Sequence, residues 1–188
     1  MSATRFGGRG RAAAGSLLFL VIAPGTVAGV IPWWLTDGWR SGWDGGAAGV
    51  AAIVLRSAGG LLLAAGIAGL LWCFGQFVWE GRGTPAPVAP TRRLVVGGLY
   101  RFVRNPMYVA IIVTVVGEAL LLGRPVLLAY AVVTWLVPAA FVRFYEEPTL
   151  LRAYGDDYRE YRAHVPGWLP RPTPWKPPTM TRWTRDGS

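Results

Sequence analysis

The amino-acid sequence predicts an all-α integral membrane protein with about four transmembrane helices. Composition is the first of three observations behind this prediction. Of the 188 residues, 53% are hydrophobic and 15% are charged, which leaves too little polar surface to cover a soluble domain. The second observation is the mean hydropathy of +0.36. The third is the pattern, because long apolar runs alternate with connections that hold most of the arginines.

The first apolar run covers residues 12–35 and follows a basic amino-terminal tail, residues 1–11, which contains three arginines. The run is long enough to cross a hydrocarbon core of ~30 Å. A cleavable signal peptide is the alternative, because basic residues before an apolar stretch also fit it and Thr26-Val27-Ala28 is a weak cleavage site. The run is long for a signal peptide, and we therefore favour a retained span.

The second apolar run, residues 49–79, exceeds the length of one crossing and contains Arg56. We place Arg56 near the outer interface, where its long side chain reaches water, and the span at about residues 58–79. Residues 80–91 contain two glycines and three prolines and predict a loop. Within the span, small residues at a four-residue spacing predict close contact with another helix: Gly60, Ala64 and Ala68, with Ala65 and Gly69 beside them.

Two further runs, residues 107–123 and 126–142, are separated by Gly123-Arg124-Pro125, which predicts a tight turn and a helical hairpin. In residues 146–164 an apolar stripe alternates with charged faces, so we expect an amphipathic helix on the cytoplasmic side. The stripe consists of Leu150, Leu151, Tyr154, Tyr158 and Tyr161. Six prolines exclude regular helix from residue 166 onward. We expect residues 166–188 to form a mobile tail behind a single membrane domain, residues 12–165.

Basic residues near the span ends predict the orientation, because arginine and lysine are retained in the cytoplasm. The two terminal regions and the connection between the second and third runs hold nearly all of them, whereas the other side has Arg40, Arg124 and Arg56. Both termini are therefore expected to be cytoplasmic. This topology explains the net charge of +9 without nucleic-acid binding, because the arginines do not share one amphipathic face. The preference for arginine over lysine indicates a GC-rich genome, and hence a bacterial cytoplasmic membrane.

Two polar segments, residues 97–108 and 144–151, bracket the expected hairpin. If the chain returns to the same side of the membrane, arginines, tyrosines and the paired carboxylates of Glu146 and Glu147 meet in a small volume. One histidine and one cysteine leave no Cys/His metal set. Arginine binds carboxylates bidentately, a carboxylate accepts from ribose hydroxyls or an ammonium, and tyrosine rings stack on bases. This inventory suits a zwitterionic, cationic cosubstrate with an adenine, such as S-adenosylmethionine.

Several blocks of sequence follow one another in this half of the chain. The first is Gly-Leu-Tyr-Arg-Phe-Val-Arg-Asn-Pro-Met-Tyr at 98–108, and the second is Glu-Glu-Pro-Thr-Leu at 146–150. Tyr-Gly-Asp-Asp-Tyr-Arg-Glu-Tyr at 154–161 and Val-Pro-Gly-Trp-Leu-Pro at 165–170 complete the pattern. In this order, the blocks resemble the isoprenylcysteine carboxyl methyltransferase and phospholipid methyltransferase superfamily, and the resemblance covers about residues 91–170. The family commonly has histidine where this chain has Asn105, which cannot act as an acid or a base.

The resemblance implies that S-adenosylmethionine binds in a cytoplasm-facing pocket between the hairpin and the carboxyl-terminal helix, within a catalytic half at about residues 91–165. It also implies that a lipophilic or small hydrophobic acceptor enters from the lipid bilayer. Of the residues expected in the pocket, Arg104, Tyr108 and Glu146 are the catalytic candidates. The residues expected to bind the cosubstrate are Tyr100, Arg101, Arg104, Asn105, Pro106, Tyr108, Glu146, Glu147 and Tyr158. A carboxylate acceptor needs no base, whereas an amine or thiol makes Glu146, Glu147 or Tyr108 the candidate base.

Two other functions fit parts of this pattern. A membrane reductase of the sterol-reductase type uses a nicotinamide cofactor, whose phosphates arginines and tyrosines can also bind, but such enzymes generally have more than four spans. A non-catalytic scaffold or lipid-binding protein is the second alternative. For single residues, Arg101 and Arg104 could instead anchor the chain to lipid phosphates. We expect Glu118, an ionisable group inside a span, to serve helix pairing or the outer interface.

Overall fold

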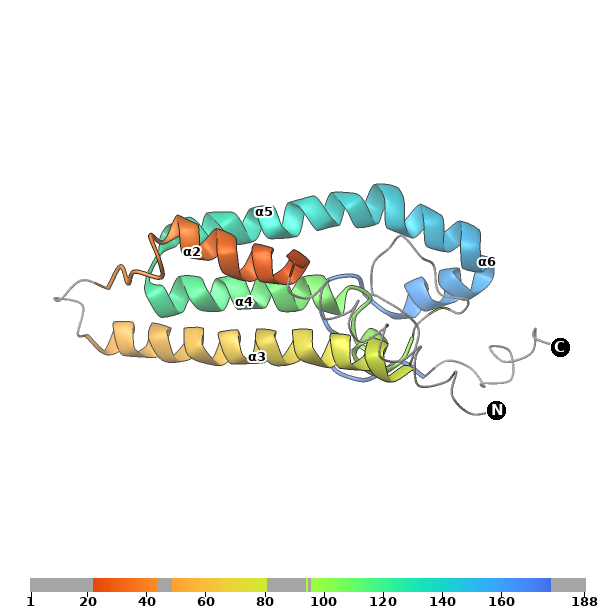
Figure 1. Cartoon of the computed structure of the whole chain (residues 1–188). Helices are drawn as coiled ribbons and strands as arrows, with labels where there is room; N and C mark the ends of the chain where they lie inside the picture. The colour runs from red at the N-terminus through yellow and green to blue at the C-terminus, as the bar shows by residue number, and fades with distance from the viewer. Residues whose placement is uncertain (1–21, 44–48, 81–93, 95, 177–188) are drawn as a thin grey trace, which may run out of the picture.

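A computed structural model describes residues 22–43, 49–80, 94 and 96–176. This part of the chain contains helices and no strands, so the predicted all-α class is confirmed for it. Figure 1 shows α3, α4 and α5 running lengthwise beside one another, with α2 alongside and α6 turning back at one end. The elements are η1 (Thr26–Val30), α2 (Ile31–Leu35), α3 (Val50–Glu80), η2 (Gly98–Arg101), α4 (Pro106–Leu122), α5 (Pro125–Phe141), η3 (Val142–Glu146) and α6 (Glu147–His164).

The first apolar run is helical over Ile22–Leu35. Residues 12–21, which we also assigned to this span, lie outside the described residues. Val27 and Ala28 pack against buried residues of α3 and α4, and the hydroxyl of Tyr130 on α5 donates a 2.9 Å hydrogen bond to the carbonyl of Val27. The weak cleavage site therefore lies inside a packed helix, which favours a retained segment over a cleaved signal peptide.

The second helix is longer than the predicted span. α3 begins at Val50 and continues through Arg56, so the helix starts eight residues before the expected start of the span at residue 58. The reason is local, because no proline or loop-forming cluster separates residue 50 from residue 58 and one exposed arginine does not interrupt a helix. The Arg56 guanidinium carbon lies 5.5 Å from the centroid of the Trp43 ring, a cation–π contact. Of the predicted loop at 80–91, Glu80 still belongs to α3 and the remainder lies outside the described residues.

Four small residues of α3, seven positions apart, are buried on one face of the helix, and two of them, Gly59 and Gly66, lie against the backbone of α4 at the seam between the two helices. Ala52, Gly59, Gly66 and Cys73 are all buried, and a seven-residue repeat keeps one helix face toward its neighbour. Of the predicted stripe, Ala64 and Ala68 are exposed, whereas a Cβ atom at Gly69 would lie 3.3 Å from the Cβ of Ala110 on α4, so only part of the stripe meets that helix. So many small residues occur in α3 that spacing alone did not identify the contacting face.

Backbone contact across this seam is close enough to require glycine. A Cβ atom at Gly59 would overlap the backbone nitrogen of Leu121 and lie 2.8 Å from the carbonyl oxygen of Gly117. The neighbouring Gly60 has nothing within 4 Å of its Cβ position. Helices in membranes associate through such small-residue contacts, because burial of apolar surface does not drive them together there.

Gly59→Ala is expected to lower the free energy of unfolding by about 2 kcal/mol, because the helices must separate to admit the methyl group. Gly60→Ala is the matched control and should raise stability by about 0.5 kcal/mol, since alanine favours the helix and meets no neighbour. Thermal unfolding of the two variants in the same detergent measures the difference. Equal midpoints would contradict the proposed seam.

The third and fourth apolar runs form α4 and α5, each one residue earlier than predicted. Gly123, with φ of 65°, caps α4 in the left-handed conformation that favours glycine. Buried side chains then hold the two helices together: Val115 and Ala119 from α4, and Leu127 and Ala131 from α5. The predicted turn at Gly123 therefore brings the start of α4 and the end of α5 to the same end of the structure.

α6 continues from α5 through the π-helical turn η3 and breaks at Gly155, which has φ of 51° and ψ of −121°. Gly155 allows this break because the left-handed region is costly for other residues. The helix after the break turns back toward the bundle (Figure 1). The predicted apolar stripe is confirmed: Tyr158 and Tyr161 are buried with Leu94, Val165 and Trp175, and Leu150, Leu151 and Tyr154 pack against them.

The segment after α6 is irregular, as the prolines predict, but residues 166–176 are not the free tail that we expected. The backbone N–H of Arg104 donates to the carbonyl of Pro166 at 2.9 Å, and that of Trp175 donates to Arg101 at 2.9 Å. Trp175 is buried, with 6% of its surface exposed. Its large ring anchors the segment. The proline-rich composition of the segment did not indicate this contact. Residues 177–188 lie outside the described residues.

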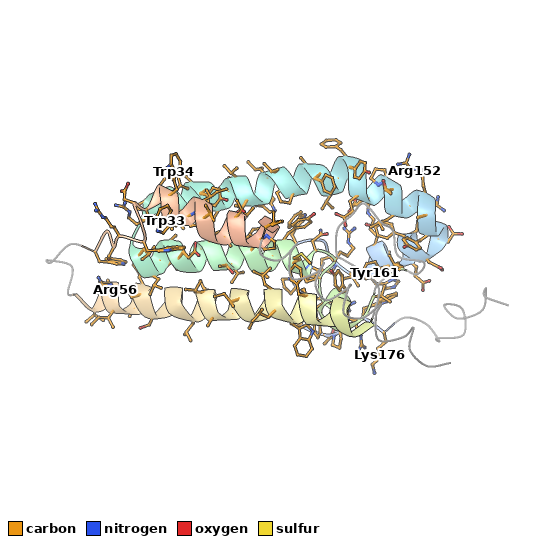
Figure 2. All side chains as sticks on the ribbon, viewed as in Figure 1. Trp33, Trp34, Arg56, Arg152, Tyr161 and Lys176 are labelled. Carbon is orange, nitrogen blue, oxygen red and sulfur yellow. The ribbon has the colours of Figure 1, made fainter. Side chains whose placement is uncertain are left out.

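Two described helical stretches are long and apolar enough to cross a membrane, Val50–Gln76 and Pro125–His164. Only 17% and 22% of their most apolar windows are buried, so their apolar side chains largely face outward. That exposure is typical of lipid-facing helices and not of the core of a soluble protein. Figure 2 shows Trp33, Trp34 and Arg56 at one end of the bundle and Arg152, Tyr161 and Lys176 toward the other.

Candidate functional site

An ionic cluster lies where η2, the start of α4 and both parts of α6 meet, with Glu147 buried, Arg104 largely buried and Arg162 exposed. Arg104 Nη1 donates to Glu147 Oε1 at 2.6 Å and to the hydroxyl oxygen of Tyr158 at 3.0 Å. Arg162 Nη1 lies 3.3 Å from the second oxygen of Glu147. Positions 104, 147 and 158 are far apart in the sequence, so the cluster forms only because α4 and α5 return the chain to this end and the break at Gly155 folds α6 back.

The backbone fixes Arg104 from two sides. Its N–H is held by the carbonyl of Pro166, and it precedes Asn105, the residue before the first turn of α4. Asn105 does not cap α4 with its side chain. Its Nδ2 instead donates to the carbonyl of Gly167 at 3.1 Å. A Cβ atom at Gly167 would lie 3.2 Å from Arg104 Nη2, so the glycine lets the segment approach the guanidinium.

Charge and burial differ between the two adjacent glutamates. Glu147 is 6% exposed and lies between Arg104 and Arg162, which stabilise its charge. Burial raises the pKa of Glu146, the Glu147 carboxylate raises it further, and Arg104 opposes both effects. Burial also raises the pKa of Tyr158, although Arg104 opposes that shift. At this end of the structure Glu147 is paired with two arginines, whereas the charged form of Glu146 is disfavoured.

Two buried atoms of opposite character have no hydrogen-bond partner among the described residues. They are Arg104 Nε, a donor, and Glu146 Oε2, an acceptor. A buried polar atom without a partner costs about 1–3 kcal/mol, so such atoms indicate a ligand or ordered water. An anionic group would satisfy the first of these atoms, and a hydrogen-bond donor would satisfy the second.

Other predicted residues surround this cluster. Tyr108 packs on Trp168, with ring centroids 6.3 Å apart, and Trp135 meets the same ring at 6.4 Å. The carbonyl of Tyr100 accepts a 2.7 Å hydrogen bond from the hydroxyl of Tyr161. Burial raises the pKa of Tyr100 well above its ordinary value, and Glu146 is among the smaller contributors, so an electrostatic interaction couples the two.

Two predicted residues have contacts elsewhere. Arg101 Nε donates to the carbonyl of Trp175 at 2.7 Å, so this side chain holds the carboxyl-terminal segment and is not part of the ion pair. Pro106 lines an apolar cavity of about 390 Å³ between α3, α4 and η2, together with Phe102, Val103 and Pro170. This cavity adjoins the residues that carry the polar cluster and has room for an apolar group.

Sequence reasoning missed Arg162 and Trp168 as residues of the site. Arg162 follows Tyr158 by four positions and therefore shares its helix face, a signal that would have placed it beside Glu147. Trp168 belongs to the Val-Pro-Gly-Trp-Leu-Pro block, but nothing in its spacing indicated the contact with Tyr108.

Tyr158→Phe is expected to lower the free energy of unfolding by about 1.5 kcal/mol, because a hydrogen bond to a charged, partly buried guanidinium is lost. Tyr145→Phe is a suitable control, since Tyr145 is 54% exposed. Chemical unfolding in detergent compares the two. A Tyr158→Phe loss no larger than that of Tyr145→Phe would contradict a structural role for this bond.

Comparison with known proteins gives consistent matches. Residues 47–157 match the family model described as Phospholipid methyltransferase. Over 109 residues the chain is 33% identical to the Protein-S-isoprenylcysteine O-methyltransferase of Schizosaccharomyces pombe, covering 52% of this chain and 46% of that protein. Over 89 residues it is 29% identical to the Phosphatidylethanolamine N-methyltransferase of Pyrenophora tritici-repentis, covering 47% and 9%.

A third relative is the Protein-S-isoprenylcysteine O-methyltransferase B of Arabidopsis thaliana, which is 35% identical over 79 residues, 42% of this chain and 40% of that protein. The chain thus spans less than half the length of these curated relatives. The matched residues 47–157 include Arg104 and both glutamates of the cluster, whereas Tyr158 and Arg162 follow them.

Proposed function

The chain belongs to the phospholipid methyltransferase family, and from this membership we propose that it transfers a methyl group from S-adenosylmethionine to a lipophilic acceptor at the cytoplasmic membrane surface. The observation that carries the proposal is the cluster of Arg104 with Glu147, next to the unpartnered Arg104 Nε and Glu146 Oε2. These two atoms fit the donor, which carries both a carboxylate and an ammonium. Arg104 would hold the carboxylate, and Glu146 would accept from the ammonium or a ribose hydroxyl.

The remaining residues would position and shield the reactants. When bound, S-adenosylmethionine supplies a methyl group on a sulfonium, a good leaving group that needs no protonation. The protein then has to align the acceptor and exclude water. Glu147, held by two arginines, keeps Arg104 in place. Trp168 against Tyr108 provides an aromatic wall on the α4 side.

The acceptor is proposed to be a lipid or a small hydrophobic molecule that reaches the site from the bilayer. The relatives are named for an isoprenylcysteine and for phosphatidylethanolamine, which both carry long apolar chains. The apolar cavity beside Pro106 suits such a chain. A carboxylate acceptor would need no base. For an amine, Glu146 is the candidate base, because a raised pKa favours proton uptake; Asn105 cannot take this role.

We further propose that the chain crosses the bilayer about four times, in the helical stretch that includes η1 and α2 and in α3, α4 and α5, with the hairpin formed by α4 and α5. The site end then faces the cytoplasm, because Arg143, Arg152 and Lys176 lie on the same side of the spans as the cluster. Both termini and the site would share this side in a bacterial cytoplasmic membrane.

The experiment compares membranes with and without the protein, each incubated with S-adenosylmethionine labelled in its methyl group. We expect a labelled, lipid-soluble product only with the protein. A parallel incubation with the reduced nicotinamide cofactor, in which oxidation of the cofactor is measured, tests the reductase alternative. Cofactor oxidation without label transfer would contradict methyl transfer, and activity with neither would favour a non-catalytic protein.

A further inference from the structure

A second cavity lies between the helical stretch Ile22–Leu35, α3 and α4. Its volume is about 480 Å³, within the range of sites that hold small ligands. Most of its wall is apolar, with Ala28 contributing from η1 and Leu63 and Leu70 from α3. Val30 and Ile67 also line it and are 59% and 45% exposed, so the cavity opens where the helices face lipid.

One acidic side chain interrupts this apolar wall. Glu118 lines the cavity, is only 4% exposed, and its Oε2 has no hydrogen-bond partner among the described residues. Thr114, the other polar side chain in the wall, donates its hydroxyl to the carbonyl of Ala110 at 2.8 Å. No lysine, arginine or histidine is among the described residues of the wall.

A carboxyl group in this position needs a partner. Buried polar atoms are almost always hydrogen-bonded, and an ionisable group inside a membrane span marks a functional site by default. The described residues around Glu118 supply no partner for Oε2, and the Glu118 side chain forms part of the cavity wall. A donor from outside the described part of the chain, such as a bound molecule, would satisfy the carboxyl group.

This cavity is separate from the candidate methyl-transfer site. Pro106 begins α4 beside the ionic cluster, and Glu118 follows twelve residues later, about 18 Å along the helix axis at 1.5 Å per residue. The two cavities share no lining residue. A ligand at Glu118 is thus too distant to receive a methyl group at the ionic cluster.

We propose that this cavity binds a membrane-soluble molecule that places an apolar chain against Ala28, Leu63 and Leu70 and donates a hydrogen bond from a hydroxyl or protonated amino group to the carboxyl group of Glu118. The apolar wall selects the chain, and the carboxyl group selects the donor. Access is lateral from the bilayer, past Val30 and Ile67. The inference does not depend on which acceptor is methylated.

The test is equilibrium binding of labelled dodecylamine and labelled dodecanol to the full-length protein in lipid nanodiscs. We expect saturable binding of at least one probe and a loss of affinity of about tenfold or more in Glu118→Leu. Glu118→Gln distinguishes the two head groups. It should weaken amine binding about tenfold because the charge is lost, and leave alcohol binding within about threefold because an acceptor remains.

Two glycine variants supply the matched control. A Cβ atom at Gly29, which lines the cavity, or at Gly60, which does not, meets nothing within 4 Å. Gly29→Leu should fill the cavity and abolish binding, whereas Gly60→Leu should bind like the native protein. Glu118→Leu should unfold at no lower temperature than native, because it removes an unpartnered buried carboxyl, so lost binding would not reflect unfolding.

Three results would overturn the proposal. The first is the absence of saturable binding by both probes. The second is native affinity in Glu118→Leu, whatever Gly29→Leu does. The third is native affinity in Gly29→Leu, which would place the ligand outside this cavity even if Glu118→Leu binds weakly.

Discussion

Arg104→Ala is expected to lower methyl transfer by roughly 100-fold and to lower the free energy of unfolding by about 3 kcal/mol. The structural loss follows because Glu147 is 6% exposed and would keep only Arg162, at 3.3 Å, as a partner. The functional loss follows because the unpartnered Nε, the proposed contact for the donor, disappears with the guanidinium. Label transfer to lipid and thermal unfolding in detergent measure the two effects.

Two further variants separate the loss of activity from the loss of stability. Arg104→Lys keeps a positive charge beside Glu147 but lacks the planar fork, so we expect most of the stability and little of the activity to return. Arg152→Ala is the matched control, because Arg152 is exposed on α6 and hydrogen-bonds to the neighbouring Thr149 hydroxyl at 3.3 Å. Full activity in Arg104→Ala would contradict the assigned role.

Glu146→Gln is expected to give the opposite combination, lower activity with unchanged or higher stability. Burial raises the pKa of the folded Glu146 carboxyl above its ordinary value of 4.5. A carboxyl whose pKa rises on folding destabilises the folded state at neutral pH, and this penalty disappears as pH falls below the unfolded-state pKa. Glutamine removes the penalty, but it also removes the anionic acceptor, so we expect methyl transfer to fall about 100-fold.

Glu147→Gln is the comparison for this prediction. It breaks ion pairs with Arg104 and Arg162 and leaves the buried Arg104 charge without its carboxylate, so stability should fall by about 3 kcal/mol. Adjacent glutamates would thus differ in the sign of their stability effect. Unfolding midpoints measured between pH 5 and 8 test the sign of the Glu146 effect. As pH falls, the stability of the native protein should rise relative to that of Glu146→Gln. Parallel loss in both variants would show that Glu146 is a structural residue.

How far the sequence specified this structure differs between its parts. Hydropathy and Gly123 located α4 and α5 to within one residue, because helix length and turn chemistry are local properties. The apolar stripe of α6 was also predictable, since it needs only helical periodicity. The face of α3 that meets α4 was not, because Gly59 and Gly60 are equivalent in composition and only the partner helix distinguishes them.

The site shows the same division. The pairing of Arg104 with an acidic residue was expected from the two polar segments that flank α4 and α5, but the choice of Glu147 over Glu146 depended on the π-helical turn η3 that precedes α6. Likewise, the proline-rich composition of residues 166–176 gave no indication that Trp175 is buried. Nonlocal packing decided each of these points.

Equilibrium binding of S-adenosylmethionine to the purified protein tests the central claim most directly. The account predicts one saturable site in the native protein and in Arg152→Ala, and affinity at least about tenfold weaker in Glu146→Gln, whose fold is retained. Native affinity in Glu146→Gln, or no saturable binding by the folded native protein, would contradict the assignment of the ionic cluster as the donor site.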